Sequence, residues 1–308
     1  MSTDTWLPNL FILGVPKAGT TSLHDWLVAH PDVKGPISKE ASFFIDPESH
    51  VFRPDFNMGL GLELYRSEFV EGGARVILDA TPTYIFQRTA LEHIPTLPSH
   101  PRCLVLVRDP AEQIFSLYRY FRDNWNDVPP DMSFDAFIRA CEARSHDFGG
   151  NELLTNALEN ADYVRHLRPW RAALGPDRLM VRSLDEMRAD PRAFTISVAQ
   201  WIGVDPGFFE SFTFARENET FQPFFRGLQR LNIAVRGYLP KGAAYTMARK
   251  IYRKMNLKRQ AVAPEEAAVL EKLRAQFEQA NAELARDYGV DVTSWQPRGK
   301  PHSRKIAS

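Results

Sequence analysis

Cysteine is scarce in this sequence, and the chain also lacks long apolar runs and any excess of charge of one sign. Two cysteines, Cys103 and Cys141, are too few for a disulfide framework. Lys and Arg together number 38, as do Asp and Glu, so the sequence lacks the overall positive charge typical of nucleic-acid binding. No apolar run approaches the roughly 20 residues of a membrane span, and no signal peptide is visible. These absences predict a reduced, soluble, cytosolic protein that does not bind nucleic acid.

The neutral total conceals an uneven distribution of charge. Ten Lys and Arg residues, and no Asp or Glu, lie between residues 226 and 259. Within this basic stretch, residues 245–255 place three apolar side chains on one helical stripe among basic ones. The stretch could be a solvated helix packed on the domain, or it could touch an anionic membrane surface or an acidic substrate. Because the apolar face is short, we favour the packed helix.

Short apolar segments alternate with helical patterns along most of the chain. Glycine, Asp-Pro and His-Pro signals bound these patterns. The expected strands are Leu10–Val15, Arg75–Leu78, Cys103–Val107 and Arg178–Val181, and the expected helices cover 22–29, 110–123, 191–202 and 264–288. This alternation predicts an α/β fold with a central parallel sheet and a helical C-terminal region. We expect a single domain over residues 1–308, with a core at about 8–205 and a basic helical part at about 206–308.

The first strand runs into the glycine-containing segment Gly14-Val-Pro-Lys-Ala-Gly-Thr-Thr-Ser22. Backbone N–H groups at a helix start, with nearby hydroxyls, can hold a phosphate. A nucleotide P-loop places its lysine directly after the second glycine, whereas Lys17 precedes Gly19 by two residues. The segment resembles the 5′-phosphosulfate loop of sulfotransferases that use 3′-phosphoadenosine 5′-phosphosulfate (PAPS). The resemblance implies a P-loop-like three-layer fold in which PAPS binds to Pro16, Lys17, Ala18, Gly19, Thr20, Thr21 and Ser22; the alternative is an ordinary strand-to-helix turn.

A second segment resembles the 3′-phosphate site of the same family. Arg108 closes the strand 103–107, and Ser116 follows two helical turns later on the next helix. The resemblance implies that Arg108 and Ser116 bind the 3′-phosphate of the donor. Taken singly, a solvated arginine and a neutral helix serine would be the simpler interpretations. The order of the two segments, each at a strand-to-helix junction, favours the family.

Lys39-Glu-Ala-Ser-Phe-Phe44 resembles the Lys-Glu-x-x-Phe-Phe stretch of the heparan-sulfate branch of sulfotransferases. In that branch the glutamate is the general base, so the resemblance implies that Glu40 takes the acceptor proton. The phenylalanines predict a partly apolar environment for this carboxylate. The alternative is a surface carboxylate paired with Lys39. Ser42 stands where the heparan-sulfate enzymes often carry a histidine.

Several weaker assignments complete the expected site. Lys258 and Arg259 are candidates for the family's late basic cofactor-binding loop. Lys39, Asp79, Thr81 and Tyr163 are expected on the acceptor side. No His-Glu-x-x-His or Cys-x-x-Cys pattern occurs, so no metal is expected.

The sequence therefore predicts a PAPS-dependent sulfotransferase that needs no metal. In this interpretation Lys17 neutralises charge on the leaving group and Glu40 is the base. The acceptor is a hydroxyl or amine of a saccharide, a glycolipid or another small molecule. A P-loop kinase or NTPase, which would require Mg²⁺, and a binding module without turnover are the alternatives.

Overall fold

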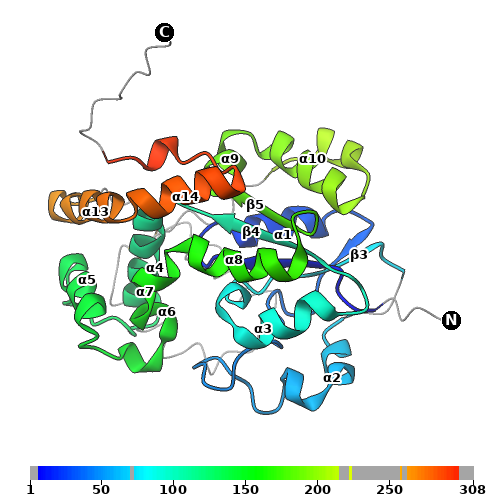
Figure 1. Ribbon diagram of the computed structural model, residues 1–308, viewed down its shortest axis with the longest axis horizontal. Helices are drawn as coiled ribbons and strands as arrows, with labels where there is room; N and C mark the ends of the chain where they lie inside the picture. Colours follow the sequence, from blue (N-terminus) through cyan, green and yellow to red (C-terminus); the bar gives the residue numbers. More distant parts are fainter. Residues whose placement is uncertain (1–5, 70–72, 215–221, 224–256, 259–261, 298–308) are drawn as a thin grey trace, which may run out of the picture.

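A five-stranded parallel sheet forms the centre of the molecule (Figure 1). The computed structural model describes residues 6–69, 73–214, 222–223, 257–258 and 262–297. The sheet has the order β2-β3-β1-β4-β5, and its strands are β2 (Val33–Lys34), β3 (Val76–Asp79), β1 (Leu10–Gly14), β4 (Arg102–Val107) and β5 (Leu179–Ser183). The four predicted strands are confirmed within one or two residues at each end, and β2 is an edge strand that the sequence analysis missed.

The two middle strands are apolar because both faces of the sheet are covered. Every residue of β1 is buried, and in β4 only Arg102 is exposed. β1 pairs with β3 on one side and with β4 on the other. β2 and β3 therefore lie on one side of β1, and β4 and β5 lie on the other, so the strand order reverses at β1. Open α/β sheets bind ligands at the carboxyl ends of the strands where the order reverses.

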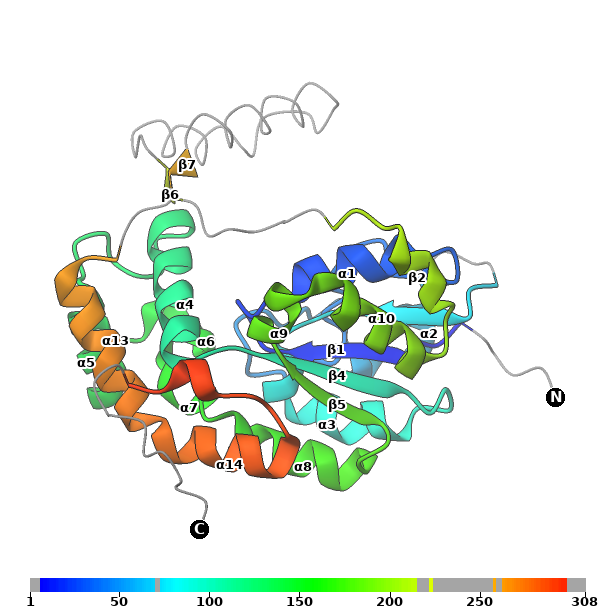
Figure 2. The same ribbon diagram turned by 90° about the horizontal axis from the view of Figure 1, so that it is seen from above.

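Helices cover both faces of the sheet, so the fold has three layers (Figure 2). One face carries α1 (Thr20–Val28), α9 (Leu184–Ala189) and α10 (Pro191–Ile202), and the other carries α3 (Arg88–His93) and α8 (Tyr163–Leu174). The predicted P-loop-like α/β fold is confirmed.

Two Asp-Pro pairs start helices as the sequence predicts. Asp109 caps α4 (Pro110–Asn124) by accepting a hydrogen bond from the Ala111 N–H at 3.0 Å. Asp190 caps α10 in the same way, through the Ala193 N–H at 2.9 Å. In both helices the proline occupies the first turn, where its missing N–H costs nothing.

A second group of helices lies beside the sheet and has its own apolar cluster. It contains α4, α5 (Phe134–Ala143), α6 (Glu152–Thr155), α7 (Ala157–Asn160) and α13 (Pro264–Gln276). The prediction of one helix over 264–288 is wrong, because the helix is divided at Phe277 into α13 and α14 (Glu278–Tyr288). Phe277 packs in the second cluster and Leu284 in the main core, so the break lets the two halves serve different cores.

Short elements complete the described chain. They are η1 (Met58–Leu60), α2 (Leu62–Arg66), η2 (Tyr84–Phe86), η3 (Ile94–Thr96), η4 (Phe148–Gly150), η5 (Pro206–Glu210), β6 (Gln222–Pro223), β7 (Leu257–Lys258) and η6 (Thr293–Trp295). No helix within the described residues is both long and apolar enough to cross a membrane. The basic segment 245–255 and Arg259 lie outside the described residues.

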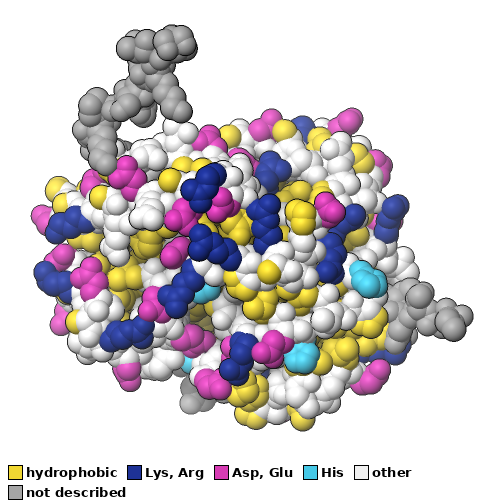
Figure 3. Space-filling view, viewed as in Figure 1, with side chains coloured by type: hydrophobic (Ala, Val, Ile, Leu, Met, Phe, Trp, Pro, Cys, Tyr) yellow, Lys and Arg dark blue, Asp and Glu magenta, His cyan; other side chains and the backbone are white. Residues whose placement is uncertain are grey.

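Basic side chains on the face drawn in Figure 3 lie among acidic ones rather than in a field of one sign. Arg168 of α8 is 2.7 Å from Glu283 of α14. This pair links the C-terminal helix to the layer that covers the sheet.

Candidate donor and acceptor site

The loop between β1 and α1 bends sharply at two residues. Lys17 has a φ of 69° and Gly19 a φ of 91°, and Gly19 is the residue that precedes α1. At Gly19 the left-handed backbone favours glycine, since a Cβ would add strain. The residue before α1 is Gly19, so no side chain at that position caps the helix. Thr20 and Ser22 are buried and Thr21 is half-buried, all within the first turn.

Three hydrogen bonds from β4 and α4 hold this loop in place. The Val15 N–H donates to the Leu106 carbonyl at 2.7 Å. The side chain of Gln113 donates to the Pro16 carbonyl at 3.0 Å, and Arg108 Nη1 donates to the Lys17 carbonyl at 3.2 Å. The two segments that the sequence analysis assigned to the two ends of one nucleotide are therefore in direct contact.

The ammonium of Lys17 lies over an aromatic ring of α4. Its Nζ is 3.9 Å from the centre of the Tyr120 ring, a distance typical of a cation–π interaction. Burial lowers the pKa of Lys17 to about 8, and the positive charge of Arg108 acts in the same direction. The charge of Glu40 opposes this shift. Lys17, Arg108 and Glu40 thus lie within electrostatic reach of one another.

Glu40 is a solvent-accessible carboxylate. Its side chain is 47% exposed, and Lys39 Nζ donates to its Oε1 at 2.8 Å. Phe43 and Phe44 are buried in an aromatic cluster with Tyr65. The apolar environment predicted for Glu40 is therefore wrong, because the phenylalanines point into the core. The geometry agrees with the surface ion pair that was the alternative.

A buried carboxylate fixes the segment that follows Glu40. Asp79 accepts hydrogen bonds from Tyr65 at 2.6 Å, from Thr81 at 2.8 Å and from Tyr84 at 3.0 Å. Burial raises the pKa of Asp79 to about 6, although these three hydrogen bonds act to lower it.

The hydroxyls of Thr81 and Tyr84 also bind the backbone of the segment that follows Glu40. Thr81 accepts from the Ser42 N–H at 3.2 Å and Tyr84 from the Phe43 N–H at 2.9 Å. Asp79 and Thr81, which the sequence analysis expects on the acceptor side, are both buried. In this structure their hydrogen bonds support the Glu40 segment.

Arg108 leads into α4, and the serine assigned with it lies further along that helix. The Arg108 side chain is 14% exposed, and its Nη2 is 3.0 Å from Glu112. Ser116 is buried on α4. Tyr163 is buried beside Arg108 and Asp109, whose charges act on its hydroxyl, and burial raises the pKa of that hydroxyl. The acceptor contact expected of Tyr163 stays a prediction. Lys258 lies in β7, whose backbone pairs with Gln222 of β6, and Arg259 is outside the described residues.

Four residues of this region were missed by the sequence analysis. Tyr120 and Gln113 touch the loop, and Glu112 and Arg274 contact the Arg108–Asp109 junction. Gln113 and Tyr120 lie on the helix predicted from residue 110, so the helical pattern is the signal that places them near Arg108. Nothing in the sequence indicates that Arg274 contacts a residue so distant along the chain.

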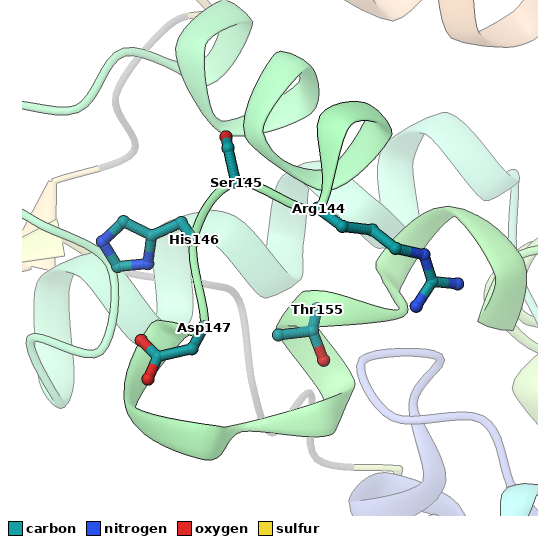
Figure 4. A pocket seen from close by; sticks show the side chains of 5 residues that line it. All are labelled: Arg144, Ser145, His146, Asp147 and Thr155. Carbon is teal, nitrogen blue, oxygen red and sulfur yellow. The ribbon is translucent and has the colours of Figure 1, made fainter.

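One further pocket lies away from these residues. A cavity of about 600 Å³ is lined by Arg144, Ser145, His146, Asp147 and Thr155, at the turn between α5 and α6 (Figure 4). None of the predicted site residues lines it. In the described ranges, no group of three or more His, Cys, Asp or Glu side chains could hold a metal ion.

A family model described as "Sulfotransferase domain" matches residues 7–223. The chain belongs to the sulfotransferase family. This confirms the family membership that the resemblance of the motifs predicted.

Two curated relatives of this sulfotransferase act on heparan sulfate according to their names. It is 26% identical over 201 residues to the mouse (Mus musculus) heparan sulfate glucosamine 3-O-sulfotransferase 3A1, covering 64% of this chain and 46% of the relative. It is 24% identical over 207 residues to the bifunctional heparan sulfate N-deacetylase/N-sulfotransferase 1 of Caenorhabditis briggsae, covering 67% and 24%. The chain thus spans less than half the length of each of these relatives.

A solved sulfotransferase structure from Alicyclobacillus acidocaldarius has the same fold. It superposes with a TM-score of 0.65 at 20% sequence identity, over 94% of this chain and 98% of that chain. At this level of identity the likeness extends to the fold alone.

Proposed function

We propose that this protein transfers a sulfuryl group from PAPS to a hydroxyl or amine of a saccharide. The contact between the 14–22 loop and Arg108, with the charges of both Arg108 and Glu40 acting on Lys17, is the observation that carries the proposal. The heparan sulfate relatives support a saccharide as the acceptor. A glycolipid and a hydroxylated small molecule are the other acceptors to be tested.

The residues present suit an anionic nucleotide as donor. Lys17, Arg108 and Lys39 bring three positive charges to the end of β1, and the backbone N–H groups that begin α1 favour a phosphate there. Arg108 has five N–H donors. Two of them bind the Lys17 carbonyl and Glu112. We assign the 5′-phosphate to residues 16–22 and the 3′-phosphate to Arg108 and Ser116.

Three residues of the proposed site, Glu40, Lys17 and Lys39, have distinct roles in the transfer. The acceptor oxygen or nitrogen attacks the sulfur, the bond from sulfur to the bridging phosphate oxygen breaks, and 3′-phosphoadenosine 5′-phosphate (PAP) leaves with the electron pair. Glu40 takes the acceptor proton, for which its exposed carboxylate is accessible. Lys17 donates to the bridging oxygen and stabilises its developing charge. Lys39 orients Glu40 through their ion pair. No step uses a metal.

Calorimetry with nucleotide products tests the donor site. PAP should bind more tightly than adenosine 5′-phosphate, which lacks the 3′-phosphate. One charge-assisted hydrogen bond contributes about 1.5–3 kcal/mol, so Arg108→Ala should reduce the preference for PAP over adenosine 5′-phosphate by roughly ten- to a hundred-fold. Binding of adenosine 5′-phosphate should fall by less, through the lost hydrogen bond to the Lys17 carbonyl. Equal weakening of both nucleotides would overturn the assignment of Arg108. Tight binding and hydrolysis of ATP with Mg²⁺ would indicate the NTPase alternative instead.

A further inference from the structure

Helix α13 reaches the proposed donor site through one buried arginine. α13 lies beside α4 in both views of the fold (Figures 1 and 2). Arg274 is 7% exposed although it is charged. Burial by itself would lower the pKa of Arg274, but its hydrogen bond to Asp109 and the charge of that residue raise it, so the guanidinium stays charged.

Arg274 contacts three carboxylates. Its Nε is 2.8 Å from Asp109, its Nη2 is 3.3 Å from Glu112 Oε1, and its Nη1 is 2.6 Å from Glu271 on its own helix. Glu112 is the shared member of this group. Its second oxygen, Oε2, accepts from Arg108 Nη2 at 3.0 Å. One carboxylate thus joins Arg274 to the arginine that we assign to the 3′-phosphate.

Because Glu112 pairs with both arginines, Arg274 affects how strongly Glu112 binds the N–H groups of Arg108. Planar guanidinium and carboxylate groups pair most strongly in a bidentate arrangement, and Arg274 disfavours that arrangement between Arg108 and Glu112 by engaging Oε1. Without Arg274, both Glu112 oxygens could pair with Arg108. Glu112 would then compete with an anionic ligand for the same N–H donors.

We propose that Arg274 is a positioning residue of the donor site, which keeps Arg108 available to the 3′-phosphate by holding one oxygen of Glu112. The inference rests on the proposed function, because it concerns the phosphate assigned to Arg108. It makes α13 part of the donor site, although α13 lies beyond residues 7–223 that match the family model.

A double-mutant cycle on nucleotide binding tests this role. Arg274→Met should weaken PAP binding by about two- to thirty-fold, the range in which residues act through a neighbour, and should leave adenosine 5′-phosphate binding unchanged. In an Arg108→Met background, Arg274→Met should have no further effect on PAP. Glu271→Gln is the matched control: it removes a partner of the same guanidinium that does not touch Arg108, and the PAP preference should be kept.

Stability and rescue separate this role from a purely structural one. Loss of Arg274 leaves the buried carboxylate of Asp109 without its ion-pair partner, so Arg274→Met will lower the free energy of unfolding. Arg274→Lys keeps the charge but not the forked geometry, and it should restore folding while leaving part of the loss in PAP preference. If Arg274→Met does not fold, the preference for PAP is measured in Arg274→Lys instead.

The possible results distinguish the two proposals. If Arg108→Met removes the PAP preference and neither folded Arg274 variant alters it, the positioning role is wrong and the donor site stands. If Arg274 and Arg108 variants weaken PAP additively, the two arginines act independently and the inference is overturned. If Arg108→Met leaves the preference unchanged, both proposals fall together.

Discussion

Lys17 should take up a proton when a nucleotide phosphate binds beside it. Burial and the charge of Arg108 lower the pKa of Lys17 from 10.5 to about 8, so its amine is partly neutral in the free protein at mildly alkaline pH. A bound phosphate places negative charge next to Nζ, which favours the ammonium form and raises the pKa. Binding should therefore be coupled to proton uptake.

The size of the effect follows from the two pKa values. If the bound phosphate restores the ordinary lysine pKa of about 10.4, uptake should be about 0.1 proton at pH 7, about 0.5 at pH 8 and about 0.9 at pH 9. Phosphate groups themselves titrate near pH 6, so they contribute little in this range. The rise with pH identifies the lysine.

Calorimetry of PAP binding in buffers that differ in ionisation enthalpy measures this uptake. The apparent enthalpy should change in proportion to the ionisation enthalpy of the buffer, with a slope that grows from pH 7 to pH 9. Lys17→Met should abolish the slope at pH 8 while the protein remains folded. A slope near zero at pH 8 in the wild type, or the same slope in Lys17→Met, would refute the placement of Lys17 at the phosphate.

Three other variants test separate parts of the site. Glu40→Gln should bind PAP normally and reduce transfer by roughly 10²–10⁴-fold, as loss of a general base does; parallel loss of binding and transfer would make Glu40 a structural residue. Tyr120→Leu should weaken PAP binding by the ~0.5–2 kcal/mol of a cation–π contact, whereas Tyr120→Phe should not, and equal effects in titrations would argue against the contact. Gly19→Ala should lower the free energy of unfolding by about 1–2 kcal/mol in urea denaturation, because its φ is 91°, and an unchanged midpoint would contradict that strain.

The repeated strand-to-helix pattern could be predicted because its signals are local. Apolar runs mark β1 and β4, and the Asp109-Pro and Asp190-Pro pairs cap α4 and α10 through neighbours two or three residues away. The order of these units also brings the 14–22 loop and Arg108 to one edge of the sheet, since both follow neighbouring parallel strands. For these reasons the fold, and the contact between the 14–22 loop and Arg108, could be predicted from the sequence.

The surroundings of individual side chains could not be predicted in the same way. Phe43 and Phe44 pack in the core while Glu40 is exposed, because adjacent residues in an irregular segment can face different environments. The burial of Asp79 depends on Tyr65 and Tyr84, which come from separate helices. Such contacts depend on how distant elements cross, which periodicity does not encode.

Transfer of radiolabelled sulfate from PAPS to an acceptor tests the central claim most directly. The wild-type protein would be incubated with labelled PAPS, without added metal, and with a panel of desulfated heparan chains, other saccharides, glycolipids and hydroxylated small molecules. We expect label in a saccharide, with the rate reduced about a hundred-fold or more in Lys17→Ala. Label in none of these acceptors, from a protein that binds PAP tightly, would contradict the account and identify a nucleotide-binding module without sulfuryl transfer.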